Sequence, residues 1–439
     1  MIVSKFGGTS VGSAENIKKV IKIVGEKREK LVVVVSALGG VTNLLVEASE
    51  LALKNDETYI RVVDDIEKRH FEAIEGLLEH ENQTVCKAEV AKTLNELKDV
   101  LNGVSLLNDL SDKSAARILS TGEILSSFII FQTMIQDGIK TTLTDSRNLI
   151  KTDDNFLNAI VDYKISYKNI LSGVTFDQSD VHILPGFIAS NSKGETTTLG
   201  RGGSDFTAAI LANALSASML EIWTDVSGMF TANPKLVKEA YPIEEISYLE
   251  AMELSHFGAK VLYPPTIQPA LDKKIPILIK NTLSPEDKGT LIADQPLQND
   301  YTVKGISHIE DIALLTLEGN GMVGVPGISK RLFGALAQNK INVKFITQAS
   351  SEHSICLAID ISESDQAKKA VDEEFEFEIL RHKINPLSVE TELAIVALVG
   401  DNMKSHQGIS GKMFSELGNN NVNIRAIAQG STEKNISAV

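Results

Sequence analysis

Two glycine-containing stretches of the sequence each place a fixed positive charge beside bare backbone. The first, 5-KFGGTSVGS-13, follows an apolar segment and precedes a segment with helical periodicity. Its adjacent glycines let backbone N–H groups approach an anion closely, the start of a helix adds partial positive charge, and Lys5 adds a full one. The spacing fits neither GxGxxG nor GxxxxGK(S/T), so no dinucleotide-binding or Walker-type loop is predicted. The stretch indicates a phosphate-binding turn, and a purely structural turn is the alternative.

The second stretch, 198-TLGRGGSDFTAAI-210, turns directly into an Ala-rich helical run. Its three glycines keep side chains out of the turn, and Arg201 supplies a guanidinium suited to bidentate capture of a carboxylate or phosphate. Ser204 or Asp205 could cap the helix that follows, and capping alone is the structural alternative for Asp205. We interpret the loop as one that holds an acidic substrate and a phosphoryl group together.

Two further stretches carry charged residues at the ends of predicted elements. In 221-EIWTDVSGMFTANPK-235, a predicted strand delivers Thr224 and Asp225 to its C-terminal end, where open α/β sheets bind their ligands. Asp225 could accept hydrogen bonds from nucleotide hydroxyls, or it could be a solvated carboxylate at a strand end. In 257-FGAKVLYPP-265, Lys260 follows a predicted helix, and a surface lysine is its default interpretation.

The elements that must position these stretches follow an α/β pattern. Residues 1–5 and 31-LVVVVSA-37 read as strands with the helical spacing of 14–27 between them, which predicts a βαβ unit. Further strands are predicted at 183–189, 219–225 and 276–281, helices at 205–216 and 246–257, and a charged helical insertion at about 56–108. Residues 1 to about 290 are therefore predicted to form one α/β domain.

The last third of the chain contains an internal repeat. Residues 327–355 and 408–436 align without a gap at an offset of 81 residues (408 minus 327). Each copy reads strand, turn, helix, strand, strand. The first copy continues into a predicted helix near 364–374 and a predicted strand near 376–381, which gives a ferredoxin-like βαββαβ unit.

The second copy of the repeat reaches Val439 inside an apolar segment. We expect the native gene product to continue beyond this residue. The segment 302-TVKGISHI-309 reads as a strand without a partner in the first copy, so it is predicted to supply part of the missing sheet edge.

Composition narrows the class of protein. A length of 439 residues predicts two or three domains. The formal net charge of −15 and the absence of a long Lys/Arg block argue against a nucleic-acid partner and against an anionic membrane. Cys86 and Cys356 lack CxxC spacing, and the N-terminus lacks a signal-peptide pattern, so a cytoplasmic protein is predicted. No metal-ligand motif is present, so no dedicated metal site is predicted; Mg²⁺ arriving with nucleotide phosphates needs few protein ligands.

Six stretches, in this order, resemble aspartate kinases: 4-SKFGGTSVGS-13, 36-SALGGVTNLL-45, 121-TGEILS-126, 196-TTTLGRGGSDFTAA-209, 222-IWTDVSGMFTANP-234 and 257-FGAKVLYP-264. The resemblance covers essentially the whole chain. It implies an amino-acid-kinase αβα sandwich over 1–290, a linker strand and first ferredoxin-like ACT domain over 300–390, and a truncated second ACT domain over 391–439. The motifs 348-QASSE-352 and 429-QGSTE-433, with 251-AMELSHFGAKVL-262, resemble bifunctional aspartokinase–homoserine dehydrogenases, although no stretch of 1–439 supplies a dehydrogenase site.

The reaction implied by the resemblance is ATP-dependent phosphorylation of the side-chain carboxylate of L-aspartate, the first step of lysine, threonine and methionine biosynthesis. A carboxylate is already a nucleophile at pH 7, so catalysis reduces to alignment and neutralisation of phosphate charge. Mg²⁺ is expected to come with the nucleotide. The paired ACT domains imply feedback by an amino acid, with threonine favoured and lysine possible, and a homodimer or higher homo-oligomer.

Residue roles follow from the resemblance position by position. The catalytic set is Lys5, Arg201 and Asp205. The nucleotide-binding set is Lys5, Gly7, Gly8, Thr9, Thr224, Asp225, Phe230, Lys235 and Lys260. The aspartate-binding set is Ser36, Thr42, Glu123, Arg201, Gly202, Gly203 and Ser204. The regulatory set is Asn342, Gln348 and Gln429.

Three residues depart from the family pattern. Phe230 stands where the family commonly has Tyr, Lys235 replaces a common Arg, and Tyr263 replaces a common His. None of these removes the catalytic set, but the first two bear on nucleotide affinity. The rival hypotheses are another amino-acid kinase, acting on glutamate, acetylglutamate or a nucleoside monophosphate, and a non-catalytic amino-acid sensor.

Overall fold

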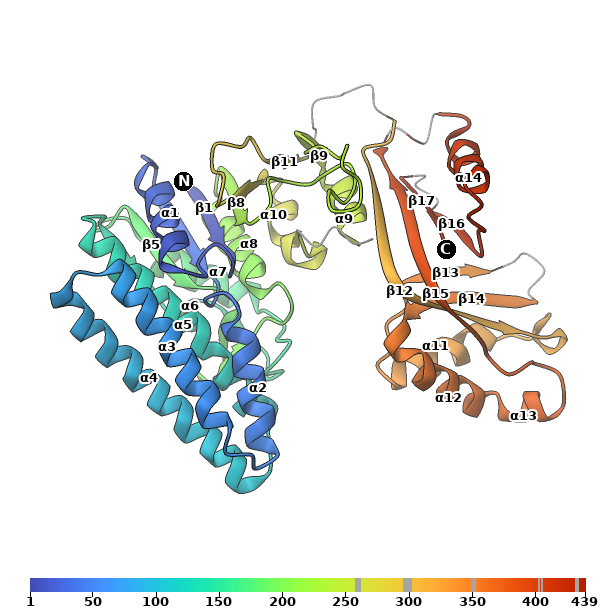
Figure 1. Cartoon of the computed structure of the whole chain (residues 1–439), viewed down its shortest axis with the longest axis horizontal. Coiled ribbons are helices and arrows are strands. Elements are labelled where there is room, and N and C mark those ends of the chain that lie inside the picture. Colours follow the sequence, from blue (N-terminus) through green and yellow to red (C-terminus); the bar gives the residue numbers. More distant parts are fainter. Residues whose placement is uncertain (257–261, 295–301, 349–352, 402, 404–405, 431–433) are drawn as a thin grey trace. The chain divides into compact units, whose positions relative to one another are not determined.

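The computed structural model describes residues 1–256, 262–294, 302–348, 353–401, 403, 406–430 and 434–439. The chain divides into two compact units, seen in Figure 1. The first unit comprises Met1–Met229, Pro242–Tyr248 and Val261–Leu297, and the second comprises Phe230–Tyr241, Leu249–Lys260 and Gln298–Val439. Two segments within the range expected for the first domain, 230–241 and 249–260, thus group with the second unit.

The first unit is built on an eight-stranded sheet in the order β3-β5-β2-β1-β8-β10-β11-β9. Its strands are β1 (Ile2–Phe6), β2 (Leu31–Val35), β3 (Thr141–Leu143), β5 (Val181–Pro185), β8 (Met219–Thr224), β9 (Glu245–Ser247), β10 (Ile277–Asn281) and β11 (Thr290–Ala293). The six strands from β3 to β10 run parallel, and β11 is antiparallel to β10. All five residues of β2 are buried, as expected for a β-branched run in a parallel sheet covered on both faces.

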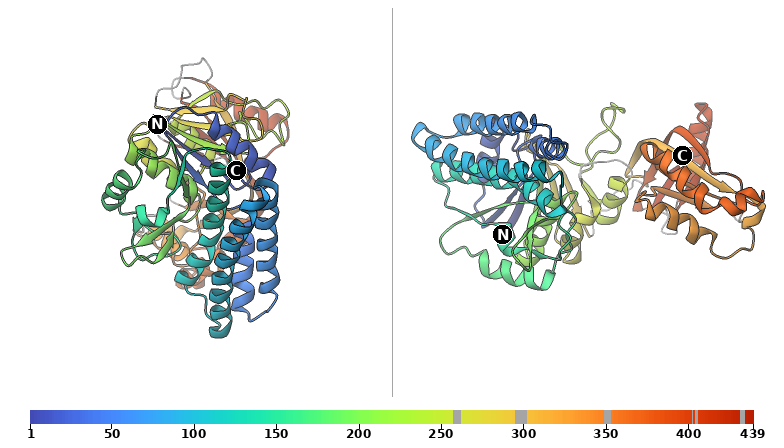
Figure 2. Two further views of the ribbon diagram at one scale, coloured as in Figure 1. Left: turned by 90° about the vertical axis from the view of Figure 1, so that its left-hand side faces the viewer. Right: turned by 90° about the horizontal axis from the view of Figure 1, so that it is seen from below.

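Helices cover both faces of this sheet. On one side lie α1 (Ala14–Gly25), α2 (Val41–Leu53), α3 (Tyr59–Leu77), α4 (His80–Leu107) and α5 (Asp112–Gln136). Figures 1 and 2 show α3, α4 and α5 running side by side, and their apolar residues share one core with Leu31, Val33 and Val35 of β2. On the other side α8 (Gly203–Leu215) packs against β1, β2 and β8. The expected αβα sandwich, with a helical insertion over 56–108, is confirmed.

The remaining elements of this part of the chain are short. A second, three-stranded sheet has the order β4-β6-β7. Its strands are β4 (Lys151–Thr152), β6 (Ile188–Asn191) and β7 (Thr196–Thr198). The short helices of the first unit are α6 (Ser146–Leu149), α7 (Tyr163–Gly173), η1 (Pro264–Ile267) and α10 (Gln268–Asp272). Helix α9 (Tyr248–His256) groups with the second unit from Leu249 onward.

The prediction of one strand at 183–189 is wrong. Residues 181–185 form β5 of the large sheet, whereas residues 188–191 form β6 of the small one. The break lies at Gly186 and Phe187, where Phe187 has the left-handed φ of 68°. A Cβ on Gly186 would lie 2.6 Å from the Ser204 Cβ, so the chain turns where only glycine fits beside α8.

The second unit contains a six-stranded antiparallel sheet in the order β13-β14-β12-β15-β17-β16. Its strands are β12 (Gly305–Glu318), β13 (Phe345–Gln348), β14 (Ser354–Asp360), β15 (Ser388–Val399), β16 (Ile427–Gln429) and β17 (Asn435–Ala438). Its helices are η2 (Asn320–Met322), α11 (Ile328–Gln338), η3 (Ile361–Glu363), α12 (Ser364–Glu374), α13 (Glu376–Leu380) and α14 (Ile409–Asn419). Helices α11 and α14 begin and end 81 residues apart (409 minus 328, 419 minus 338), as the repeat predicts.

The sheet of each half of the repeat is completed by a strand of the other half. The C-terminal part of β12 pairs with β14 of the first half, while its N-terminal part, Gly305–Ile309, pairs with Val399–Ile395 of β15 in the second half. The N-terminal part of β15, in turn, pairs with β12 at the position of the first half's fourth strand. The prediction that 302–309 supplies a sheet edge to the second half is confirmed.

The strand predicted near 376–381 is wrong, because residues 376–380 form α13. The alternating Phe and Glu residues there suit a strand, but the edge of β12 that such a strand would join is already paired with β15. Phe377 and Leu380 are instead 67% and 71% exposed. Tertiary pairing therefore overrides the local pattern.

A buried carboxylate ties together three elements of the first unit. Glu221 on β8 is 4% exposed and accepts hydrogen bonds from the Ser4 hydroxyl of β1 at 2.8 Å and from the Trp223 indole N–H at 2.9 Å. Lys27, which follows α1, forms an ion pair with the same carboxylate. Burial of the charged Glu221 carboxylate is tolerated only because these hydrogen-bond donors and the Lys27 ammonium compensate for the lost water.

Lys27→Ala should lower the free energy of unfolding by about 3 kcal/mol, because it leaves the Glu221 carboxylate buried without a cation. Urea titration followed by the fluorescence of Trp223, the one tryptophan of the chain, measures this. The matched control is Lys22→Ala in the same region of α1, where the pair with Glu26 is 4.0 Å long and exposed, and where a loss below about 0.5 kcal/mol is expected. Equal losses in the two variants would contradict the assignment.

Candidate active site

A pocket of about 540 Å³ lies at the C-terminal ends of the parallel strands of the first unit. Lys5 reaches it from the end of β1, Ser36 from the residue after β2, and Phe187 from the turn after β5. Helix α5 adds Glu123. The full lining comprises Lys5, Gly8, Ser36, Ala37, Leu38, Gly39, Gly40, Thr42, Leu119, Glu123, Leu157, Phe187, Thr198, Gly200, Arg201, Gly202, Gly203, Ser204 and Asp205.

The turn after β1 is held by its backbone. The Gly7 N–H donates to the Trp223 carbonyl at 3.0 Å, so the turn is fixed to the neighbouring strand β8. A Cβ on Gly8 would lie 3.2 Å from the Ala37 carbonyl oxygen, and one on Gly39 would lie 3.1 Å from the Gly8 carbonyl oxygen. The turns after β1 and β2 thus pack backbone against backbone, which leaves their polar groups next to the pocket.

The second glycine stretch enters α8 through two residues in the left-handed region. Gly200 and Gly202 both have φ of 71°, and Gly202 is the N-cap of α8. The expectation that Ser204 or Asp205 caps the helix is wrong, because both lie inside its first turn. There the Asp205 carboxylate forms an ion pair of 2.7 Å with the Lys5 ammonium, and both side chains are 12% exposed. The two predicted chemistry-bearing stretches therefore meet.

Arg201 lies on the rim of the same pocket. Its side chain makes no ion pair with any residue that the structure describes, and its guanidinium carbon lies 5.3 Å from the centroid of the Tyr263 ring. The exposed guanidinium keeps its N–H groups available for a carboxylate or phosphate.

Glu123 is the second acidic residue of the pocket, and it is 4% exposed. Burial raises the pKa of Glu123 to about 8, against the opposing effects of the Ala37 backbone N–H and of Lys5. Its Oε2 has no hydrogen-bond partner within the described parts of the chain. A buried carboxylate oxygen of this kind can accept from a cationic donor brought by a ligand.

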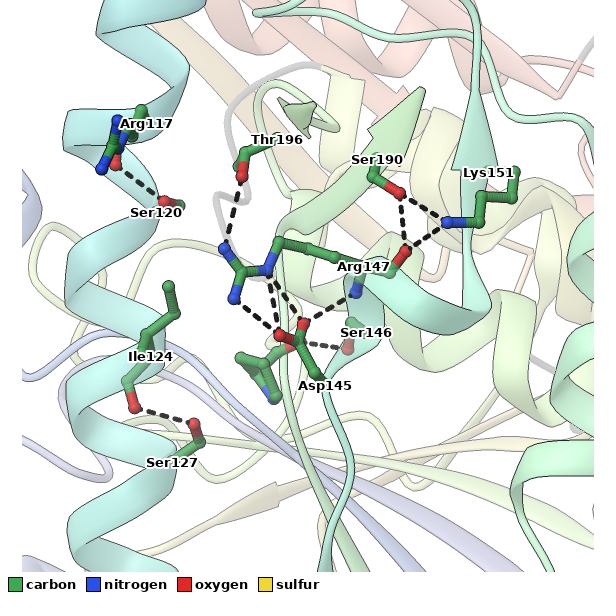
Figure 3. A network of polar contacts seen from close by, with 11 residues as sticks. Arg117, Ser120, Ile124, Ser127, Asp145, Ser146, Arg147, Lys151, Ser190 and Thr196 are labelled. Carbon is green, nitrogen blue, oxygen red and sulfur yellow. Dashed lines mark hydrogen bonds and ion pairs between the residues drawn. The ribbon is translucent and has the colours of Figure 1, made fainter. Parts of the chain in front are cut away.

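A polar network holds the strand that leads into the second glycine stretch (Figure 3). Arg147 of α6 binds the Asp145 carboxylate, with Nη2 2.6 Å from Oδ2, and donates to the Thr196 hydroxyl of β7 at 3.3 Å. Lys151 of β4 donates to the Ser190 hydroxyl of β6 at 2.7 Å and to the Arg147 carbonyl at 2.8 Å. The small sheet is thereby fixed to α6, and with it Thr198 in the pocket wall.

The pocket brings together ten of the predicted site residues: Lys5, Gly8, Ser36, Thr42, Glu123, Arg201, Gly202, Gly203, Ser204 and Asp205. Gly7 and Thr9 belong to the same turn as Gly8 but do not line the pocket. Thr224 and Asp225 lie at the end of β8, beside Gly7, with the Thr224 hydroxyl donating to the Asp225 carboxylate at 3.1 Å. Phe230 and Lys235 belong to the second unit, and Lys260 lies outside the described residues.

Sequence reasoning missed five larger side chains of the pocket wall: Leu38, Leu119, Leu157, Phe187 and Thr198. A signal existed for Phe187, since the Pro-Gly pair before it marks a strand break. Leu157 carries no local signal, because it reaches the pocket through a loop whose Asn158 forms a bridge with Leu199.

The predicted regulatory residues lie in the second unit at equivalent places. Gln348 ends β13 and Gln429 ends β16, the two edge strands of the six-stranded sheet. Both side chains are exposed, as is that of Asn342, which precedes β13.

Comparisons with known proteins agree with this architecture. The family model for the amino acid kinase family matches residues 1–281, and the model for the ACT domain matches residues 315–375 and 396–439.

Individual relatives cover the whole chain. A bifunctional aspartokinase/homoserine dehydrogenase of Buchnera aphidicola is 37% identical over all of this chain, which spans 54% of that relative. The lysine-sensitive aspartokinase 3 of Escherichia coli is 33% identical over 99% of this chain and 94% of its own length. The crystal structure of E. coli aspartokinase III in complex with aspartate and ADP has a TM-score of 0.84 and 32% identity, covering 100% of this chain and 95% of that one. The chain thus spans about half the length of the bifunctional relative.

The sequence resemblance and the expected fold, an amino-acid-kinase domain with ACT domains, are both confirmed by these matches. Because the likeness extends over the entire chain in sequence and in fold, this chain belongs to the aspartokinase family of enzymes, which transfer a phosphoryl group to a carboxyl acceptor.

Proposed function

We propose that this chain phosphorylates the side-chain carboxylate of L-aspartate with ATP, giving 4-phospho-L-aspartate and ADP. The observation that carries this proposal is the charge arrangement of the pocket. An unpaired carboxylate oxygen on Glu123, an unpaired guanidinium on Arg201 and the ammonium of Lys5 line one cavity among described residues. Aspartate presents the complementary set of one ammonium and two carboxylates.

The roles follow from charge and position. Glu123 accepts from the aspartate ammonium, and Arg201 clamps one carboxylate, with Ser36, Thr42 and the Gly202–Ser204 turn completing the aspartate subsite. The other carboxylate is left beside Lys5. A carboxylate oxygen attacks the γ-phosphorus, the bond from that phosphorus to the bridging oxygen breaks, and ADP leaves. No proton has to be removed from the nucleophile, so positioning and charge neutralisation account for the chemistry.

The nucleotide is assigned to the Gly7–Thr9 turn and to the end of β8, with Thr224 and Asp225 facing its hydroxyls. Phe230, Lys235 and Lys260 stay predictions from the sequence for nucleotide binding. The pocket's own acids are Glu123, which is protonated over part of the neutral range, and Asp205, which is already paired with Lys5. They form no metal cage, and no group of three or more His, Cys, Asp or Glu residues gathers within the described residues. We expect Mg²⁺ to arrive with the nucleotide phosphates and to screen their charge.

The second unit is proposed to regulate the reaction by binding an amino acid, with threonine favoured and lysine as the alternative. The relative named lysine-sensitive aspartokinase 3 supports regulation by an amino acid. The equivalent positions of Gln348 and Gln429 on the two edge strands support a pair of related sites. Exposed edge strands also favour a homodimer or higher homo-oligomer formed through the ACT domains.

The proposed function is tested by trapping the acyl phosphate with hydroxylamine in the presence of MgATP. Aspartate is expected to give the hydroxamate, and glutamate and acetylglutamate are expected to give none above background. Transfer to nucleoside monophosphates, whose diphosphate products hydroxylamine does not trap, is measured by ADP release and is expected to be absent. Preference for another acceptor would assign the chain to a different amino-acid-kinase reaction. Absence of transfer to every acceptor would favour a sensor.

Lys5→Ala should lower kcat by at least about 100-fold, because the transferring phosphoryl group loses its preorganised positive charge. The dissociation constant for aspartate should rise by a much smaller factor, since Glu123 and Arg201 remain although Asp205 loses its cation. Steady-state kinetics and calorimetry measure the two effects. Lys193→Ala, which removes an exposed lysine of the same unit, is the control and should leave both unchanged. Turnover like that of the wild type in Lys5→Ala would refute the phosphate role.

The kcat/KM for aspartate should rise with pH through about 8. Below this pH the Glu123 carboxyl, whose pKa burial raises to about 8, is protonated in the free enzyme and cannot neutralise the substrate ammonium; above it the carboxylate is available. Glu123→Gln should lower kcat/KM and remove this rise between pH 6.5 and 9. If kcat/KM of the variant still rises over this pH range, another group titrates and the assignment of Glu123 is wrong.

Gln348→Ala should blunt feedback inhibition while leaving kcat nearly unchanged, since Gln348 lies in the second unit. Loss of one amide hydrogen bond to the effector is expected to raise the inhibitory threonine concentration about fivefold. Inhibition curves with threonine, lysine and methionine, measured on the intact gene product, check this and identify the effector. If none of the three inhibits the wild type, the regulatory assignment fails.

A further inference from the structure

Arg201 is held in the pocket by an aromatic ring, not by an acid. Its guanidinium carbon lies 5.3 Å from the centroid of the Tyr263 ring, within the range of a cation–π contact. No carboxylate among the described residues forms an ion pair with it. Tyr263 itself does not line the pocket, so its ring supports Arg201 from outside the cavity.

The Tyr263 ring has a fixed place because its backbone is constrained. Tyr263 precedes Pro264, which disfavours the helical region, and it has the extended φ of −100° and ψ of 109°. Its carbonyl accepts from the Thr266 backbone N–H at 3.0 Å and from the Thr266 hydroxyl at 2.6 Å. Thr266 is only 3% exposed, so this anchor is part of the protein interior.

The same ring packs on the glycine turn that carries Arg201. A Cβ on Gly202 would lie 3.2 Å from the Tyr263 Cβ, 3.3 Å from its Cδ1 and 2.9 Å from the Thr266 Cγ2. Gly202 also has φ of 71°, so both its conformation and its surroundings favour glycine. The backbone of the turn and the ring therefore form one packed unit, which fixes the origin of the Arg201 side chain next to the ring.

A ring face is better suited than a carboxylate to hold the Arg201 guanidinium ready for a substrate. A carboxylate would occupy the N–H donors of Arg201, and a substrate would have to displace it. A π face attracts the guanidinium while taking up none of its N–H donors in conventional hydrogen bonds. The pocket acid nearest in sequence, Asp205, is already paired with Lys5 and does not compete.

We propose that Tyr263 is a positioning residue that pre-orders the Arg201 guanidinium for the carboxylate of the amino-acid substrate. This role rests on the proposed function, in which Arg201 clamps aspartate. Its effect is on substrate affinity, because an arginine that is already ordered loses less side-chain freedom on binding.

The test compares Tyr263→Phe, which keeps the ring, with Tyr263→Leu, which removes it, by steady-state kinetics on the intact chain. Tyr263→Leu should raise KM for aspartate about three- to fivefold, as expected for a partly exposed cation–π contact. The kcat should stay within about twofold and KM for ATP should not change. Tyr263→Phe should retain the wild-type KM for aspartate. In an Arg201→Ala background, Tyr263→Leu should add no further increase.

Several outcomes would overturn this role while leaving the proposed function intact. These are an unchanged or lowered KM in Tyr263→Leu, an equal effect of Phe and Leu, or an additive effect in the Arg201→Ala background. The last result would mean that Tyr263 acts through packing alone. A wild-type protein that forms no aspartyl hydroxamate would overturn the proposed function and this role together, so the two failures are distinguishable.

Discussion

The ion pair between Lys5 and Asp205 is the contact on which the arrangement of the pocket depends. It joins the end of β1 to the first turn of α8, two elements 200 residues apart in the chain (205 minus 5). Both side chains are mostly buried, so removing either one would leave the other charge without its partner inside the unit. By fixing the lysine ammonium, the pair also determines where positive charge is presented to a ligand.

Glycines allow the rest of the pocket to assemble around that pair. The turns after β1 and β2 approach each other so closely at Gly8 and Gly39 that their backbones touch. Gly202 brings Arg201 against the Tyr263 ring in the same way. Glu123 is buried beside the turn after β2, whose Ala37 N–H hydrogen-bonds to it; burial raises its pKa, and its Oε2 has no hydrogen-bond partner among the described residues. Close backbone packing at the glycines thus leaves room for the charged side chains that line the pocket.

The fold of the second unit depends on a different constraint, which is that the edge strands of each half need a pairing partner. Each half of the repeat is one strand short, and the long strands β12 and β15 each serve both halves. Pairing across the halves makes one continuous six-stranded sheet, whose outer strands carry Gln348 and Gln429. Neither half can complete its sheet alone, so a change in one half acts on strands that the other half also uses.

The amino-acid sequence by itself determined the elements and the charged residues. The periodicity of 14–27, the β-branched run at 31–35 and the 81-residue repeat each predicted a segment that the structure contains, because these signals depend on spacing along one element. The glycine stretches likewise indicated Lys5 and Arg201 as ligand-binding residues. Only the tertiary structure decided that 376–380 is a helix, that Asp205 pairs with Lys5 instead of capping α8, and that Leu157 and Phe187 enclose the pocket. Those outcomes depend on which strand edges are free and which residues meet across the fold, and neither is encoded by local spacing.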